Sequence, residues 1–178
     1  MERIPAGWLP HYTYWDYQQW ENKWELIRGV PYAMSPGSLR KHQLVGGKFV
    51  YLAVAQIREQ SLACNCEVLY EADWRIDEDT VVRPDVMILC DAPESDYVQV
   101  PPALVVEIFS PATRLKDRNL KFRLYETNGV RYYLMIDPER QAIEMYQLHN
   151  NAYTDYSGDT FQLNDRCSVQ LNLNQLWQ

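Results

Sequence analysis

Apolar residues in this chain fall into short runs separated by polar turns, a pattern that predicts several strands and two longer helices. The clearest run is 103–109, where six of seven positions are apolar. Such a run is typical of a strand covered on both faces. A second run, 86–89, belongs to a predicted strand over 81–89 that Pro84 interrupts. Shorter strand patterns are present at 67–70, 74–76, 131–136, 142–148 and 167–173.

The longest predicted helix runs from residue 39 to about residue 58, because apolar positions recur there at helical spacing and Ser38 can cap its first turn. His42 lies on the same apolar stripe, where a histidine is more often a hydrogen-bonded core residue than a catalytic one. Gly46 and Gly47 each cost helix stability, roughly 1 kcal/mol. Close packing against a neighbouring strand is one reason to keep them.

A second helix is expected to end near Asn128, with Gly129 as its C-terminal cap and Asp117 as one candidate N-cap. Nearer the N-terminus, a short helix is expected within 12–21, and a hairpin over 24–34 turns at Gly29. The order of strands, helices and hairpins favours an α/β or α+β sheet with helices on its faces. A length of 178 residues favours one domain.

The net charge is −7, which counts against tight non-specific binding to nucleic acid, because proteins that follow phosphates carry a basic patch. A local basic cleft still agrees with the sequence, since residues 114–123 hold five basic side chains and one acidic one. A solvated helix face explains this stretch about as well.

The four cysteines, Cys64, Cys66, Cys90 and Cys167, contain no CxxC spacing, and Cys64 and Cys66 are too close to suggest a zinc knuckle. We expect four reduced thiols, with metal or redox use as the less favoured alternative. The three histidines also lack zinc-binding spacing. No apolar run approaches the ~20 residues that span a bilayer, and the N-terminus lacks the features of a secretory signal. We therefore expect a cytoplasmic protein without a membrane partner.

Two acidic residues stand next to apolar runs and are the first candidates for chemistry. Glu107 lies inside the most apolar strand, where an unpaired carboxylate costs several kcal/mol, so it must be paired, protonated or bound to metal. Asp85 begins the other apolar run. If these strands are neighbours, the two carboxylates form a hard-oxygen site suited to Mg²⁺ or Mn²⁺. Lys121, in the helix that follows Glu107, would orient the attacking water or neutralise developing charge.

Each of these residues also has a purely structural interpretation. Glu107 could form a buried ion pair with an arginine, and Asp85 could only cap a turn after Pro84. Lys121 could lie on a helix surface and pair with Asp117 four residues earlier. The candidate arginine partners of Glu107 in such an ion pair are Arg83 and Arg123.

An ordered series of motifs extends these observations. It consists of Arg83–Val86, Leu104–Thr113, Asp117 with Lys121 and Tyr125, Gly129–Val130 and Asp137–Pro138, preceded by Trp24–Gly29, Met34–Pro36 and His42. This series closely resembles the Uma family of restriction-endonuclease-like proteins, over residues 24 to about 153. The family commonly has Glu-Tyr-Trp after its Gly-Val pair, where this chain has Arg131-Tyr132-Tyr133.

The resemblance implies a PD-(D/E)xK nuclease core, a mixed sheet flanked by helices, with an added N-terminal hairpin and C-terminal strands. The single domain would span 1–178, with an extension over 1–23 and the core over about 24–153. The usual lysine of a PD-(D/E)xK site stands two residues after the second acid, where this chain has Phe109. The resemblance implies that in the Uma family the lysine comes from the following helix, where this chain has Lys121. The implied catalytic residues are Asp85, Glu107 and Lys121, the implied metal ligands are Asp85, Glu107 and the Ile108 carbonyl, and the supporting residues are His42, Glu25 and Tyr125.

The implied activity is a Mg²⁺- or Mn²⁺-dependent endonuclease that hydrolyses DNA, for which a homodimer would favour cutting both strands. One alternative is an inactive nuclease-fold protein that binds nucleic acid or a protein partner, and the aromatic stretch 12–24 would suit such an interface. Another is an unrelated structural domain in which an arginine neutralises Glu107.

Overall fold

The centre of the computed structural model is a six-stranded sheet in the order β10-β9-β8-β7-β6-β3. The structure describes residues 10–34, 40–60, 64–95, 97–110 and 114–178. Strands β7 and β8 pair in parallel, and the other pairs are antiparallel. The strands are β3 (Cys66–Tyr70), β6 (Val86–Cys90), β7 (Leu104–Ile108), β8 (Tyr132–Asp137), β9 (Ala142–His149) and β10 (Ala152–Asp155).

A second sheet of four strands lies beside the first in the order β2-β1-β5-β4. Its first two strands form the predicted hairpin, and both turn residues, Arg28 and Gly29, have positive φ, at 51° and 75°. This conformation suits a two-residue hairpin turn. The strands are β1 (Trp24–Ile27), β2 (Val30–Ala33), β4 (Trp74–Asp77) and β5 (Thr80–Val82), and a separate pair consists of β11 (Thr160–Gln162) and β12 (Ser168–Gln170).

The strand predicted over 81–89 is interrupted at Pro84 as expected, but its two parts belong to different sheets and do not form one strand. Its first part is β5 of the smaller sheet, and its second part is β6 of the central sheet. Pro84 lies between them and has no N–H to donate to a strand ladder. This crossing places the residue after the proline, Asp85, at the start of a central strand.

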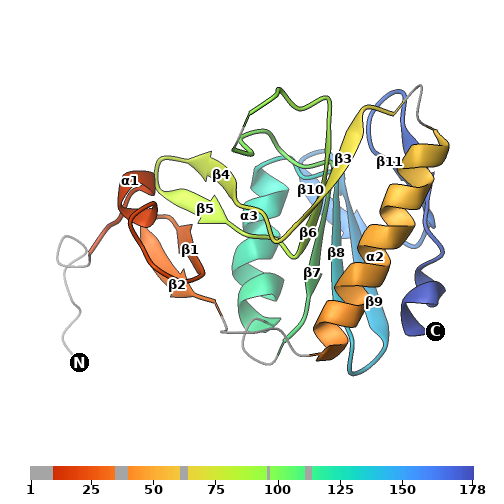
Figure 1. Ribbon diagram of the computed structural model, residues 1–178, viewed down its shortest axis with the longest axis horizontal. Coiled ribbons are helices and arrows are strands. Elements are labelled where there is room, and N and C mark those ends of the chain that lie inside the picture. The colour runs from red at the N-terminus through yellow and green to blue at the C-terminus, as the bar shows by residue number, and fades with distance from the viewer. Residues whose placement is uncertain (1–9, 35–39, 61–63, 96, 111–113) are drawn as a thin grey trace.

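Helices cover both faces of the central sheet (Figure 1). Helix α2 (Arg40–Glu59) lies on one face, close to its predicted bounds. On the other face, a π-helical turn η2 (Lys116–Lys121) leads directly into α3 (Phe122–Thr127). The predicted C-terminal glycine, Gly129, has φ +79° as expected. The other helices in the described residues are α1 (Tyr14–Tyr17) and the 3₁₀ helix η3 (Leu173–Trp177).

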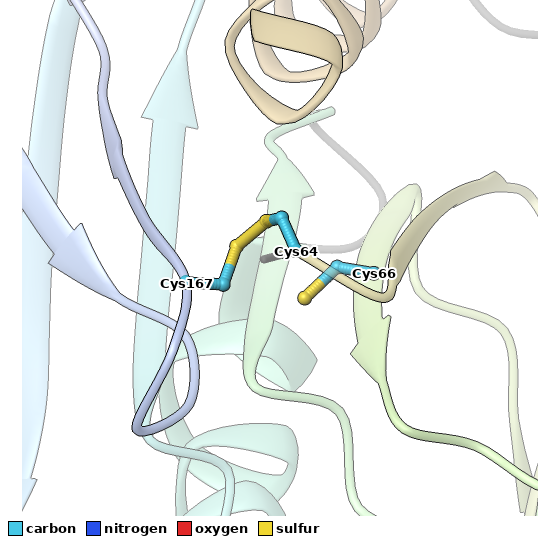
Figure 2. A group of neighbouring side chains, drawn as sticks. All are labelled: Cys64, Cys66 and Cys167. Atoms are coloured by element: carbon cyan, nitrogen blue, oxygen red, sulfur yellow. A yellow bond between two sulfur atoms is a disulfide. The ribbon is translucent and has the colours of Figure 1, made fainter. Parts of the chain in front are cut away.

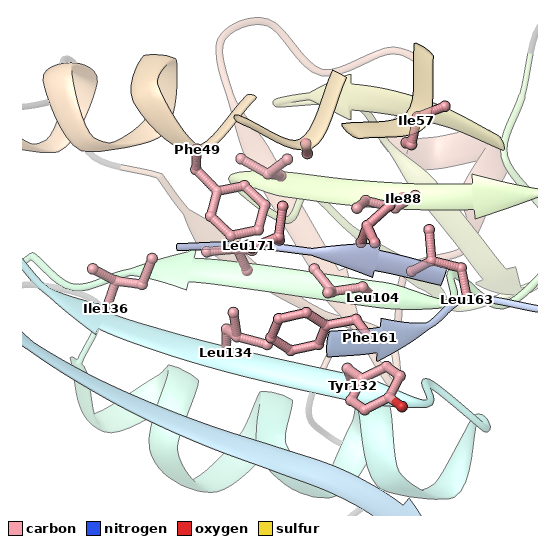
Figure 3. Packing of buried hydrophobic residues seen from close by; sticks show 14 of the residues in the cluster. Phe49, Ile57, Ile88, Leu104, Tyr132, Leu134, Ile136, Phe161, Leu163 and Leu171 are labelled. Atoms are coloured by element: carbon pink, nitrogen blue, oxygen red, sulfur yellow. The ribbon is translucent and has the colours of Figure 1, made fainter. Parts of the chain in front are cut away.

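Alternating residues of the central strands divide the core into two halves. Val86, Val106 and Leu134 face α2 and the β11–β12 pair, where Phe49 and Phe161 complete the packing shown in Figure 3. The neighbouring residues in the strands face α3 and the smaller sheet. They are Met87, Leu89, Val105, Tyr133 and Met135. Glu107 follows this alternation and points to the α3 face.

Gly46 allows α2 to approach the sheet closely, as the sequence predicts. A Cβ atom at this position would lie 2.9 Å from the ring of Tyr70 and 3.2 Å from Cδ1 of Ile108. At Gly47 an added Cβ would meet nothing within 4 Å, so close packing does not explain the second glycine.

The expectation of four reduced thiols is wrong. Disulfides join Cys64 to Cys167 and Cys66 to Cys90. Cys66 and Cys90 are direct cross-strand partners, with Cα atoms 4.0 Å apart. Cys64 and Cys167 are 103 residues apart in the chain, and only the placement of the β11–β12 pair against the end of α2 brings them together.

The aromatic stretch 12–24 is mostly packed on itself, which corrects its interpretation as an exposed interface. Tyr14 is buried, and the Trp20 ring meets Tyr17 and Trp24 edge-on at 5.6 and 5.7 Å. Trp15 is exposed, at 62%. The predicted cap at Ser38 and the motif residues Ser35, Pro36 and 111–113 lie outside the described residues. None of the helices in the described part of the chain has the length and apolarity needed to cross a bilayer.

Candidate active site

Asp85 and Glu107 lie opposite each other at one end of two neighbouring strands. The antiparallel register of β6 and β7 pairs Val86 with Val106. Asp85, which precedes Val86, therefore faces Glu107, which follows Val106. Asp85 Oδ2 also accepts the backbone N–H of Ile108 at 2.6 Å. The structure thus brings both predicted acids to the same edge of the sheet.

Lys121 lies directly against Glu107, on the α3 side of the sheet. Its Nζ is 2.7 Å from Glu107 Oε1 and 2.6 Å from Glu25 Oε1. Tyr125, one turn further along the helix, donates its hydroxyl hydrogen to the same Glu107 oxygen at 2.6 Å. Glu25 comes from β1 of the smaller sheet, so the lysine joins the two sheets at this point.

The π-helical turn explains how two lysines reach the same carboxylate. Lys116 contacts Glu25 Oε2, and Lys121 contacts Oε1. Residues five apart differ by about 140° around an α-helix, which would turn one lysine away. A π turn bonds i to i+5 and brings such residues onto one face, and π turns occur often at functional sites.

Asp117 is a further member of the cluster, and its prediction as an N-cap is wrong. It lies inside the π turn and is buried, 3.8 Å from Lys121 Nζ. The Tyr133 hydroxyl donates to the Asp117 carbonyl at 3.1 Å. Sequence reasoning did not place Asp117 or Lys116 in the site. The i,i+4 spacing of Asp117 and Lys121 predicts their contact in an ordinary helix, whereas Lys116, five residues before Lys121, is indicated only if the turn is known to be π.

Burial and charge act in opposite ways on the two glutamates. Burial raises the pKa of Glu107 well above its usual range, the Lys121 ammonium offsets this only in part, and the carboxylates of Asp117, Asp85 and Glu25 raise it further. Burial also raises the pKa of Glu25, but Lys121 and Lys116 together outweigh that effect and lower it. The difference follows from having two ammonium neighbours instead of one.

The same acids keep Lys121 protonated. Burial lowers the pKa of this ammonium, but Glu107, Glu25 and Asp117 outweigh burial and raise it well above the usual value. Lys121 is therefore a fixed cation at neutral pH, suited to supplying charge and hydrogen bonds and unsuited to accepting a proton.

His42 reaches the site from α2, on the opposite side of the sheet. Its Nε2 is 3.3 Å from Asp85 Oδ1. Burial lowers the pKa of His42, but the contact with Asp85 outweighs it, and the net shift is upward. The side chains of His42, Asp85 and Lys116 are 10%, 13% and 14% exposed, against 4% or less for Glu107, Lys121 and Glu25. Solvent therefore meets the cluster at its Asp85 end.

The proposed arginine partners of Glu107 are engaged elsewhere. Arg83 pairs with Asp73 at 2.6 Å and Arg123 with Glu126 at 2.7 Å. The basic stretch 114–123 is likewise neutralised within the chain, since each of its five basic side chains has an acidic partner. The remaining pairs are Arg114–Asp137, Lys116–Glu25, Arg118–Glu144 and Lys121–Glu107.

Comparison with known proteins decides the family. The Uma2 family model, described as a putative restriction endonuclease, matches residues 14–177. The chain belongs to the Uma2 family. A relative, uncharacterized protein slr1290 of Synechocystis sp., is 30% identical over 182 residues, which cover 93% of this chain and 88% of that protein.

A solved structure confirms the expected fold of this Uma2 chain. The crystal structure of a putative nuclease belonging to DUF820 from Anabaena variabilis superimposes with a TM-score of 0.74 at 15% identity. The match covers 93% of this chain and 97% of that one. The restriction-endonuclease-like assignment, a mixed sheet flanked by helices, therefore holds.

The donors at the Uma2 site fit a hard divalent cation. Carboxylate and carbonyl oxygens are the ligands that Mg²⁺ and Mn²⁺ prefer. The site contains four carboxyl groups and two lysine ammonium groups, so its net charge is two negative charges when all four acids are ionised. The raised pKa of Glu107 reflects the same excess. A divalent cation beside Asp85 and Glu107 would offset it. The four acids are Glu25, Asp85, Glu107 and Asp117, and the two lysines are Lys116 and Lys121.

Proposed function

We propose that this Uma2 protein is a Mg²⁺- or Mn²⁺-dependent endonuclease that hydrolyses phosphodiester bonds in DNA. The observation that carries the proposal is the meeting of Asp85 and Glu107 on neighbouring strands, with the Lys121 ammonium 2.7 Å from Glu107. Two carboxylates can hold the cation of a metal-assisted phosphodiester hydrolysis, and a lysine beside them can stabilise the developing negative charge.

Asp85, Glu107 and the backbone carbonyl of Ile108 would hold the ion. Such an ion polarises a phosphodiester and lowers the pKa of a bound water. The Ile108 N–H fixes the Asp85 carboxylate, and His42 approaches its other oxygen. These contacts hold the more solvent-exposed acid in one orientation, which favours a preorganised site.

Lys121 supplies positive charge beside the reacting phosphate. Because its pKa is raised, it donates hydrogen bonds to the attacking water or to the developing negative charge and does not remove a proton. Glu25, braced by Lys116, holds the ammonium group on one side, and Glu107 holds it on the other. Tyr125 orients Glu107 through its hydroxyl.

Incubation of supercoiled plasmid with the protein and Mg²⁺ or Mn²⁺ tests the proposal. The unmodified protein should nick or linearise the plasmid, and Asp85→Asn, Glu107→Gln and Lys121→Ala should each lower the rate about 100-fold or more. Matched controls are Glu59→Gln and Lys48→Ala, which change the same residue types on α2 outside the acid cluster. Cleavage that persists in Asp85→Asn, or that is absent with both metals, contradicts the proposal.

One observation favours an alternative, in which the fold is inactive and serves as a binding module for nucleic acid or protein. Glu25, Lys121 and Glu107 are almost completely buried and already pair with one another, as a structural ion-pair cluster would. This alternative predicts destabilised variants without any cleavage by the parent protein, and salt-sensitive retention of labelled DNA on a filter would identify the nucleic-acid form. Light scattering tests the homodimer that cutting both strands would favour.

A further inference from the structure

All four cysteines of the chain meet at one end of the central sheet. Cys66 and Cys90 face each other on β3 and β6, and Cys64 and Cys167 join the end of α2 to the start of β12. The sulfur atoms of Cys64, Cys66 and Cys167 lie within 4.8 Å of one another. Figure 2 shows the Cys66 sulfur pointing toward the Cys64–Cys167 bridge.

This sulfur cluster is separate from the acid site. Asp85 comes just before the first residue of β6, and Cys90 is the last residue of that strand. Five residues of extended strand span roughly 16 Å. The two groups of residues therefore serve different purposes, and a metal at one does not report on the other.

Non-covalent contacts hold the cysteine-bearing segments together independently of the disulfides. Asp91, next to Cys90, accepts hydrogen bonds from Asn164 at 2.7 Å and Arg166 at 2.9 Å. Its backbone N–H donates to the carbonyl of Asn65 at 2.9 Å. Asn65 lies between two of the cysteines, and Arg166 precedes Cys167. Reduction would thus leave four thiols in place at short range.

We propose that the reduced cluster binds one Zn²⁺ through the four cysteine thiolates. Tetrahedral zinc with Zn–S bonds near 2.3 Å requires sulfur atoms roughly 3.8 Å apart. The sulfur atoms of Cys64, Cys66 and Cys167 lie within 4.8 Å of one another, and the fourth, that of Cys90, is bonded to the Cys66 sulfur and would turn to the metal after reduction. Each protein disulfide accepts two electrons and two protons from an added dithiol and becomes two cysteine thiols. The added dithiol is oxidised to its own disulfide. Zn²⁺ then replaces the four thiol protons, which pass to solvent.

A four-thiolate site has no open coordination position, so this zinc is structural. It would replace the covalent link between the β11–β12 pair and the sheet with a metal link. Reducing compartments disfavour disulfides, and the zinc form is the one that such a compartment would maintain.

Metal analysis of the reduced full-length protein tests this proposal. Protein reduced with dithiothreitol, freed of reductant without oxygen and given Zn²⁺, should hold one zinc per chain after desalting. Co²⁺ in its place should give the sulfur-to-cobalt charge-transfer absorption of a tetrahedral thiolate site. Cys66→Ser and Cys90→Ser should each weaken zinc binding at least tenfold, and Asp85→Asn should leave it unchanged.

Alkylation provides a measurement that does not depend on variants. Zinc should protect the reduced thiols of the unmodified protein from iodoacetamide, as counted by mass spectrometry. Reduced protein with an unchanged circular dichroism spectrum that holds no zinc, shows no cobalt charge-transfer band and alkylates equally fast with and without zinc would overturn the proposal.

Discussion

Glu25 and Glu107 belong to different sheets and share one ammonium group, with Lys121 Nζ 2.6 Å from the first and 2.7 Å from the second. Glu25 has a second cation, Lys116, whereas Glu107 accepts a hydrogen bond from the neutral Tyr125 hydroxyl. The two carboxyls therefore differ in their protonation behaviour although they contact the same lysine. Several measurable properties depend on this arrangement.

Lys121→Met should destabilise the fold, because it leaves two buried carboxyls without their common cation. Breaking a buried ion pair from one side typically costs about 3–5 kcal/mol. Urea unfolding followed by circular dichroism measures the free energy of unfolding. The double variant Glu107→Gln/Lys121→Met should recover part of the loss, since it removes one of the stranded charges. A loss no larger than that of Lys48→Ala would contradict the shared ion pair.

Glu107→Gln should change how stability depends on pH. The pKa of Glu107 is raised in the folded state. The contribution of this group to the free energy of unfolding is therefore fully present below the pKa of the unfolded chain, about 4.3, and is lost as pH rises through the folded pKa. The glutamine variant lacks this loss. Its free energy of unfolding relative to the unmodified protein should therefore increase from pH 5 to pH 8. A difference that stays flat over this range argues against an abnormal Glu107.

Mg²⁺ should raise the melting temperature more at pH 8 than at pH 5. A cation bound to Asp85 and Glu107 favours the ionised carboxyl, and ionisation of Glu107 is hindered in the metal-free protein. Differential scanning fluorimetry with Mg²⁺ and with matched NaCl ionic strength measures the shift. Asp85→Asn should abolish it, and an equal shift in that variant would place the bound ion elsewhere.

His42 should titrate above its usual value of about 6.5, because it contacts Asp85. Its contribution to stability is present below pH 6.5 and is lost as pH rises through the folded pKa. NMR titration of the imidazole measures this pKa. In Asp85→Asn the histidine should titrate at a lower pH, since the contact that raises its pKa most is removed and only the smaller effects of Glu71 and Asp117 still oppose burial.

Gly46→Ala and Gly47→Ala should have opposite effects on stability. The new methyl at position 46 would lie 2.9 Å from the Tyr70 ring and 3.2 Å from Ile108, and overpacking of this kind costs about 1–3 kcal/mol. At position 47 it meets nothing within 4 Å, so the gain in helix propensity, about 1 kcal/mol, should dominate. Thermal unfolding of the two variants checks the sign of each effect.

Much of the site could be predicted from the sequence because its signals are local. An acid inside the apolar run 103–109 and another at the start of the run 86–89 are conflicts visible within a few residues. The long helix, the hairpin at Gly29 and the cap at Gly129 depend on short-range patterns and follow the prediction. The motif resemblance added Glu25, His42 and Tyr125 to the acids and the lysine.

Other features depend on contacts between distant parts of the chain. The change of sheet at Pro84, the pairing of Lys116 with Glu25 across 91 residues and the Cys64–Cys167 bridge across 103 residues have no local signal. The π turn that aligns the two lysines also escapes sequence patterns, because a single turn is too short to show a periodicity of its own. The sequence by itself determined which residues were out of place in an apolar core. Only the tertiary structure decided which charges and thiols meet, since burial and pairing are properties of the packed elements together.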